Sequence, residues 1–176
     1  MQTVPELRYS AVDYAILGVV AAVMGVVFVV AWDFYYLVKA LLGPIGARVF
    51  TYGIWFMAAP LAASLVRKPL SAFSGEVLAA LVETIIPTYG GYTNLIYGVA
   101  QGLASELAYL IFGYRRWGPL QAALSGALAG PVAVTLDQIL FPELITAKTF
   151  AALVLAATAS GALYGLIAYG VSRVRK

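Results

Sequence analysis

The segment from Val12 to Ala31 constrains the fold most, because its twenty residues are almost wholly apolar and include one charged side chain, Asp13. At about 1.5 Å of rise per residue, such a helix crosses the roughly 30 Å hydrocarbon core of a bilayer. It is too long for a removable signal peptide, and further apolar segments follow it. We predict six spans in one domain that fills residues 1–176. The predicted spans are residues 12–31, 50–66, 72–86, 95–113, 120–140 and 150–171.

The composition indicates an all-α integral membrane protein. The chain is 62% hydrophobic and 11% charged, whereas a soluble domain carries about 25% charged residues. It contains no cysteine and no histidine, which removes disulfides, thiolate metal sites and the usual general base. We therefore expect no catalytic residue, no metal site and no cofactor. The net charge is +3, and the cationic residues flank the predicted spans, so we expect no nucleic-acid partner.

The cationic side chains predict how the chain lies in a cell membrane. Eight fall on one side of the predicted spans: Arg8, Arg67, Lys68, Arg115, Arg116, Arg173, Arg175 and Lys176. Three fall on the other: Lys39, Arg48 and Lys148. Because cytoplasmic loops are rich in Lys and Arg, we predict that both termini are cytoplasmic. Residues 32–49, 87–94 and 141–149 then form outward-facing loops.

Four acids lie within the predicted spans, and no lysine or arginine does. They are Glu76, Glu83, Glu106 and Asp137. An unpaired charge at the centre of a bilayer costs about 2.5 to 3.5 kcal/mol on insertion scales, so each acid needs a partner. Glu76 and Glu106 lie toward the cytoplasmic side. We expect structural ion pairs or partner contacts for both acids. The cationic side chains near enough to pair with them are Arg67, Lys68, Arg115 and Arg116.

Glu83 and Asp137 lie near the predicted outer ends of their spans. The span at residues 72–86 is short, about 22 Å, and Pro87 follows it, which predicts irregular backbone around a pocket near the outer face. Glu83 is the leading site candidate, completed by a cationic ligand, a proton or a hydrogen-bond donor. For Asp137, a hydrogen bond to a neighbouring helix is an equally good explanation.

Polar and aromatic residues near Glu83 complete the predicted pocket. One face of the fourth span carries Asn94, Tyr97 and Gln101 at helical spacing. Aromatic candidates are Tyr52, Trp55, Tyr89 and Tyr92, although an interfacial aromatic belt also explains tyrosines near a membrane surface. The outer segment 32–49 is either a lid over this pocket or a short interfacial helix.

Small residues recur at helical spacing in three spans. In the first span Ala15, Gly18 and Ala22 form a stripe that could face a partner subunit. Stripes in the last two spans predict close packing of helices inside the bundle. They comprise Gly126 and Gly130 in one span and Ala157, Gly161 and Gly165 in the other.

Four motifs carry a resemblance to a known family: YGIWF at 52–56, VRKP at 66–69, GEVLAALVE at 75–83 and YGVAQGLASE at 97–106. They resemble the YkoE-like S components, which are substrate-binding membrane subunits of energy-coupling factor (ECF) vitamin transporters for thiamine or its hydroxymethylpyrimidine (HMP) moiety. The resemblance implies a six-helix bundle that captures the vitamin from outside. It also implies a transmembrane coupling (T) subunit and two ATPase subunits as partners.

The same resemblance implies roles for particular residues. The stripe of Ala15, Gly18 and Ala22 would meet the coupling subunit. The pocket residues carried over by motif are Glu83, Trp55, Tyr52 and Gln101. The tyrosine-rich loop TYGGYTN at 88–94 departs from the shorter loop of the family.

Two other functions are compatible with parts of the pattern. A self-sufficient carrier driven by protons or ions would use Glu83 and Asp137 as its titrating sites, but the two halves show no evident inverted repeat. An intramembrane enzyme would need a nucleophile and a base, and the chain offers no plausible pair. We therefore expect a binding subunit that is not an enzyme.

Overall fold

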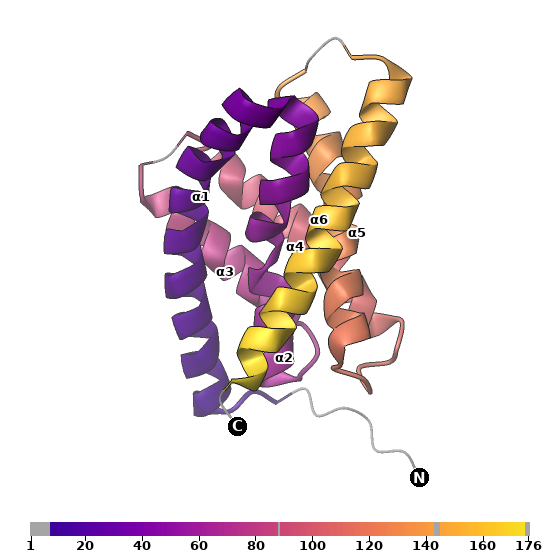
Figure 1. The fold of residues 1–176 in the computed structure, drawn as a ribbon. Coiled ribbons are helices and arrows are strands. Elements are labelled where there is room, and N and C mark those ends of the chain that lie inside the picture. Colours follow the sequence, from indigo (N-terminus) through magenta and orange to yellow (C-terminus); the bar gives the residue numbers. More distant parts are fainter. Residues whose placement is uncertain (1–7, 88, 143–144, 175–176) are drawn as a thin grey trace.

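The computed structural model describes residues 8–87, 89–142 and 145–174, and these residues contain helices and turns but no strand. In chain order the elements are α1 (Ala11–Thr51), the 3-10 helix η1 (Tyr52–Phe56), α2 (Ala58–Val66), α3 (Ser71–Ile85), α4 (Thr93–Leu110), α5 (Pro119–Leu140) and α6 (Ala147–Arg173). The all-α prediction is confirmed. The helices form one bundle, and the start of α1 and the end of α6 lie at the same end of it (Figure 1).

Among the described residues, three stretches are long and apolar enough to cross a membrane: Ala11–Val66, Pro119–Leu140 and Ala147–Arg173. The α3 helix has 15 residues, which is short for a full crossing. The connections from α2 to α3 and from α4 to α5, which contain four of the cationic side chains, lie at the same end of the bundle as the start of α1 (Figure 1). The number of spans and the cytoplasmic location of the termini stay predictions.

The first helix continues far beyond its predicted end. Residues 32–49 are helical, and the break comes at Gly43, whose φ of 70° is followed by Pro44. No glycine or proline precedes this pair after the predicted span, so nothing in the local sequence stops the helix earlier. After the kink the chain turns over and descends toward α2 (Figure 1). Because Tyr35 and Val38 are buried, the predicted outer loop belongs to the helical core.

Two buried carboxylates complete the starts of helices. Glu76 accepts the backbone N–H of Ala59 at 2.9 Å, in the first turn of α2. Glu106 accepts the N–H groups of Leu70 at 2.6 Å and Phe73 at 2.9 Å, at the start of α3. The first N–H groups of a helix have no partner within it, and a carboxylate is a strong acceptor for them.

The predicted ion pairs of Glu76 and Glu106 are therefore wrong. Within the described ranges, the ion pairs are Arg48 with Asp137 and Lys68 with Asp13. A buried helix start supplies a donor close to the carboxylate, so neither acid needs a long cationic side chain from the end of the bundle.

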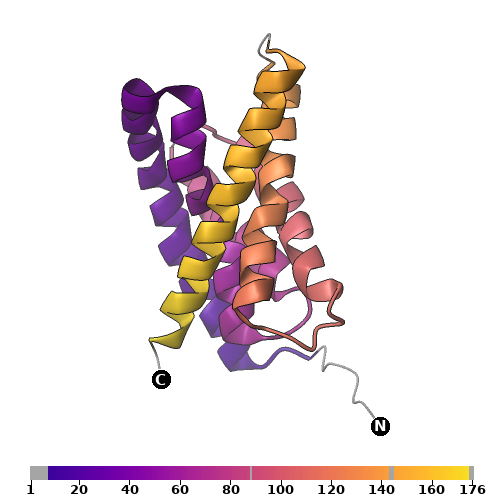
Figure 2. The same cartoon turned by 45° about the vertical axis from the view of Figure 1, so that its right-hand side comes forward.

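The small-residue stripes of the last two spans pack inside the bundle, as predicted, and they pack against each other. A side-chain carbon added at Gly126 would collide with the carbonyl oxygen of Gly161, and one added at Gly161 would collide with that of Gly126. Gly165 meets the carbonyl of Ala122 in the same way. Helices α5 and α6 run side by side in both views (Figures 1 and 2). Their backbones approach this closely because the contacting positions carry no side chain.

We expect Gly161→Ala to destabilise the protein by about 1 to 3 kcal/mol, because the new methyl group forces two helix backbones apart. Thermal unfolding in detergent measures the change. The matched control is Gly18→Ala in α1, where an added carbon meets nothing within 4 Å. The control gains helix propensity and should be neutral or slightly stabilising. Equal melting temperatures for the two variants would contradict the packing argument.

Candidate functional site

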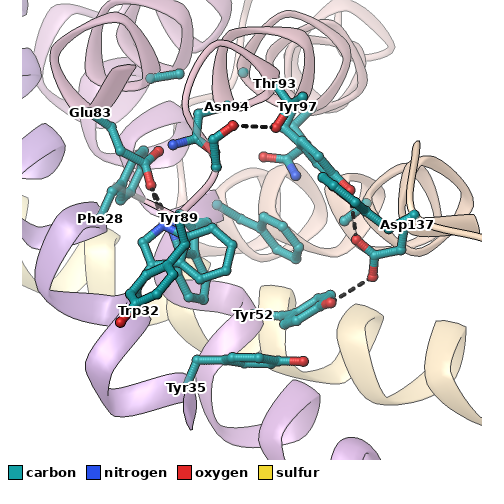
Figure 3. Close-up of a pocket in the computed structure, with 18 of the residues that line it drawn as sticks. Phe28, Trp32, Tyr35, Tyr52, Glu83, Tyr89, Thr93, Asn94, Tyr97 and Asp137 are labelled. Atoms are coloured by element: carbon teal, nitrogen blue, oxygen red, sulfur yellow. Dashed lines mark hydrogen bonds between the residues drawn. The ribbon is translucent and has the colours of Figure 1, made fainter. Parts of the chain in front are cut away.

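A cavity of about 290 Å³ lies among α1, η1, α3, α4 and α5. The start of α4 and the end of α5, which contribute to its lining, lie at the end of the bundle opposite the start of α1 and the end of α6 (Figure 1). Eight of the nine predicted site residues line it, although they come from four elements and one connection. These eight are Tyr52, Trp55, Glu83, Tyr89, Asn94, Tyr97, Gln101 and Asp137. The close-up in Figure 3 shows Glu83 and Asp137 on different sides of this space.

Glu83 is buried, with 3% of its surface exposed. Its Oε1 accepts the indole N–H of Trp32 at 2.9 Å and that of Trp55 at 3.3 Å. The second oxygen, Oε2, accepts no hydrogen bond from the residues that the structure describes. No lysine or arginine among these residues forms an ion pair with Glu83 either. One oxygen of the carboxylate is thus held in place, and the other remains available to a donor or a cation.

Aromatic rings form the wall beside Glu83. The ring centre of Trp32 lies 5.2 Å from that of Trp55 and 6.0 Å from that of Tyr89. Tyr35 continues the wall, 6.3 Å from Trp55. Ring faces of this kind attract cations and stack on planar ligands.

Trp32 and Tyr35 were missed by the sequence reasoning because their segment was predicted to be a loop. The signal was present, since Trp32, Tyr35 and Lys39 follow one another at steps of three and four residues. All three line the cavity. Helical periodicity in the segment after Ala31 would have placed them on one face.

Both carboxylate oxygens of Asp137 accept hydrogen bonds from other residues of the chain. It accepts the guanidinium Nη2 of Arg48 at 3.1 Å and the hydroxyl of Tyr52 at 2.6 Å through Oδ2. Its Oδ1 accepts the hydroxyl of Tyr97 at 2.8 Å. The side chains of Arg48 and Asp137 are 7% and 17% exposed, so this ion pair is largely buried. Asp137 therefore holds α1, η1, α4 and α5 together at the cavity wall, whereas Glu83 keeps a free oxygen.

The polar face of α4 points at the same space. Asn94 and Gln101 are 6% and 4% exposed, and both line the cavity. The helix can lie close to α3 because a side-chain carbon added at Gly98 would collide with the Cβ of Ala80. The amide groups of α4 are thereby brought to the same cavity as the acid of α3.

The two loop tyrosines differ from each other. Tyr89 is 70% exposed but stands at the rim, with its ring centre 5.1 Å from that of Tyr36. Tyr92 is 77% exposed and is not among the residues that line the cavity, so its predicted role in binding has no support from this geometry and stays a prediction. Gly91 lies between them with a φ of 52°, a left-handed turn that redirects the chain before α4 begins.

The predicted partner stripe lies on the outside of the bundle. Ala15, Gly18 and Ala22 are all exposed on α1. Gly25, one turn further along the helix, is buried instead against Val82 of α3. The stripe is therefore a surface that packs on no other part of the described chain.

The sequence of the chain matches known proteins over a large part of its length. A family described as "ABC-type cobalt transport system, permease component" matches residues 12–132. The chain belongs to this family. The chain is also 34% identical over 98 residues to YkoE of Bacillus subtilis (strain 168), whose name describes an HMP/thiamine permease protein. That match covers 56% of the chain and 49% of YkoE, so it spans about half the length of this curated relative.

A solved structure extends the likeness to nearly the whole chain. The crystal structure of an S-component of an ECF transporter superposes with a TM-score of 0.89 at 26% sequence identity. The match covers 96% of this chain and 86% of that chain. The resemblance predicted from the four motifs is confirmed: the chain is a homologue of YkoE and has the fold of an ECF S-component. These relatives are named as transporter parts and not as enzymes.

Proposed function

We propose that this permease is the substrate-binding S component of an ECF vitamin importer and that it captures thiamine or HMP in the cavity beside Glu83. The observation that carries this proposal is the free Oε2 of Glu83, held beside two indole rings in a space lined by several more aromatic rings. The name of YkoE supports the choice of vitamin.

The chemistry of thiamine suits this arrangement. Its thiazolium ring is a permanent cation, which a carboxylate and ring faces attract. Its aminopyrimidine ring carries an amine that can donate to a carboxylate oxygen. The cavity, at about 290 Å³, is close to the lower end of the size range of small-molecule sites and suits one small ligand.

Cobalt, which the family description names, finds few suitable ligands here. Cobalt ions favour nitrogen donors such as imidazole, and the chain contains no histidine and no cysteine. Across residues 8–87, 89–142 and 145–174, no group of three or more acidic, histidine or cysteine side chains is arranged to hold a metal. An organic ligand is the better match to this cavity.

We further propose that the exposed stripe of Ala15, Gly18 and Ala22 meets the transmembrane coupling subunit, with two ATPase subunits driving uptake. Support comes from the S-component fold and from the outward position of the stripe. Small residues allow helices to approach closely in a bilayer, where packing drives association. One domain of six spans with cytoplasmic termini remains part of this proposal.

Binding by the isolated protein tests the proposal. We expect thiamine or HMP to bind at one molecule per chain, seen as a mass shift in native mass spectrometry. Tryptophan fluorescence should change on titration, because Trp32 and Trp55 line the cavity. Choline is the matched control ligand, since it is a cation without an aromatic ring. Absence of a response to both vitamins, or equal binding of choline, would reject the proposal.

Reconstitution separates this function from that of a self-sufficient carrier. In proteoliposomes that contain the chain alone, we expect no concentrative uptake of thiamine, with or without a proton gradient. Accumulation driven by the gradient would support the carrier, with Glu83 and Asp137 as its titrating groups. The full engagement of Asp137 with Arg48 and two tyrosines favours the binding subunit.

A further inference from the structure

We propose that Glu76 and Gln101 form a second recognition subsite in the same cavity, so that one ligand contacts two separate carboxylates. The ligand is then the complete two-ring vitamin and not its pyrimidine half. This inference rests on the proposed function and narrows its substrate.

Glu76 lies on α3 seven residues before Glu83, which places it two turns, or about 10 Å, deeper along the same face of the helix. It is 1% exposed and still lines the cavity. Its Oε2 accepts the N–H of Ala59 at 2.9 Å. Its Oε1 accepts no hydrogen bond from the described residues, and no described cation pairs with it. Glu76 thus repeats the state of Glu83, with one oxygen held and the other open.

Gln101 is the second open group at this depth. It is 4% exposed, lines the cavity and forms no hydrogen bond with any other residue that the structure describes. Nearly all buried polar side chains in proteins have a partner. Gln101 lies next to Gly102 on α4, where an added carbon would be 3.2 Å from the Cβ of Glu76, so α4 packs directly on α3 here. A buried amide without a partner therefore lines the same part of the cavity as the open carboxylate.

Glu76 and Gln101 together suit the edge of a nitrogen heterocycle or a hydroxyl arm. The carboxylate accepts a hydrogen bond, and the amide can both donate and accept. At the other end, Glu83 and its indoles suit a cation or a second donor. A single pyrimidine ring cannot reach both acids across about 10 Å of helix. Thiamine can, since it has an amine on one ring and a hydroxyethyl arm on the other.

Calorimetric titration of four proteins with thiamine and with HMP tests this arrangement. The proteins are the wild type, Glu76→Gln, Gln101→Leu and Glu83→Gln. We expect thiamine binding to weaken by at least about tenfold in both glutamate variants, as for loss of a hydrogen bond to a charged group. HMP can occupy only one subsite. The affinity for HMP should therefore fall in one glutamate variant and stay within about twofold of wild type in the other, as for sites that do not interact.

Gln101→Leu should weaken binding of the same ligands as Glu76→Gln, because the two residues share a subsite. The loss of affinity should be smaller than in Glu76→Gln. The amide oxygen of Glu76→Gln can still accept the N–H of Ala59, so its melting temperature should stay close to that of wild type. Asp33→Asn is the control, since Asp33 is an exposed acid of α1 that does not line the cavity. It should leave both affinities unchanged.

The outcomes separate this inference from the proposed function. Wild-type affinity for thiamine in Glu76→Gln, or equal loss of HMP in both glutamate variants, would overturn the second subsite and leave the proposed function standing. A wild-type protein that binds neither ligand would reject the proposed function and this inference together.

Discussion

Asp137→Asn should destabilise the fold by about 3 to 5 kcal/mol, the usual effect of removing one partner of a buried ion pair. Arg48 is 5% exposed, and its Nη2 donates to Asp137 at 3.1 Å. Its Nε has no hydrogen-bond partner among the described residues, so no other acceptor compensates. The asparagine keeps one carbonyl oxygen, which can accept from Tyr52 or Tyr97, and its NH2 group can donate to the hydroxyl oxygen of the other tyrosine, so most of the loss comes from the charge. Thermal unfolding in detergent measures the loss.

The double variant Arg48→Met with Asp137→Asn supplies the control. It removes the unpaired guanidinium while keeping the amide for the two tyrosines. Replacing both members of a buried pair is often close to neutral. We therefore expect the double variant to recover much of the stability that Asp137→Asn loses. A double variant no more stable than the single one would show that the charge of Arg48 is not the cause.

Glu83→Gln should weaken thiamine binding by at least about tenfold, because a neutral amide replaces the carboxylate that attracts the cation or amine of the ligand. The fold should remain intact. The amide oxygen can still accept the indole N–H groups of Trp32 and Trp55, which Oε1 accepts in the wild type at 2.9 and 3.3 Å. Calorimetric titration gives the affinity, and the melting temperature checks the fold.

The same control, Asp33→Asn, distinguishes a local effect of Glu83 from a general effect of charge near the mouth of the cavity. Asp33 follows Trp32 in the chain, but its side chain is exposed and does not line the cavity. Its loss should change thiamine affinity by less than about twofold. If Glu83→Gln bound thiamine as tightly as wild type, Glu83 would have no place in the site.

Helix bounds follow from the sequence where local signals are strong. The predicted spans 72–86, 120–140 and 150–171 correspond to α3, α5 and α6 within about three residues at each end. Each of these apolar runs is bounded by proline, glycine or charged residues. The first helix was predicted too short, because an apolar segment without such a stop is compatible with a loop, a lid or a helix. Its end at Gly43 and Pro44 became clear only from the backbone.

The functional residues show the same division. A polar face on α4 could be recognised because Asn94, Tyr97 and Gln101 are close in sequence and separated by helical steps. The partners of the acids could not be recognised in this way. Trp32 is 51 residues from Glu83, and Arg48 is 89 residues from Asp137. No local pattern encodes such pairings, and this is why the sequence predicted an ion pair or a partner contact for Glu76 and not its hydrogen bond to the start of α2.

The sequence by itself determined that this chain is a helical membrane protein with four acids that need partners, since hydropathy and charge are properties of each segment. Only the tertiary structure decided which of the four acids have partners within the chain for both carboxylate oxygens. Glu106 completes a helix start and Asp137 pairs with Arg48, while Glu76 and Glu83 each keep one open oxygen in the same cavity. Hydrogen bonding depends on distance in space, and folding alone brings α1, α3, α4 and α5 within reach of one another.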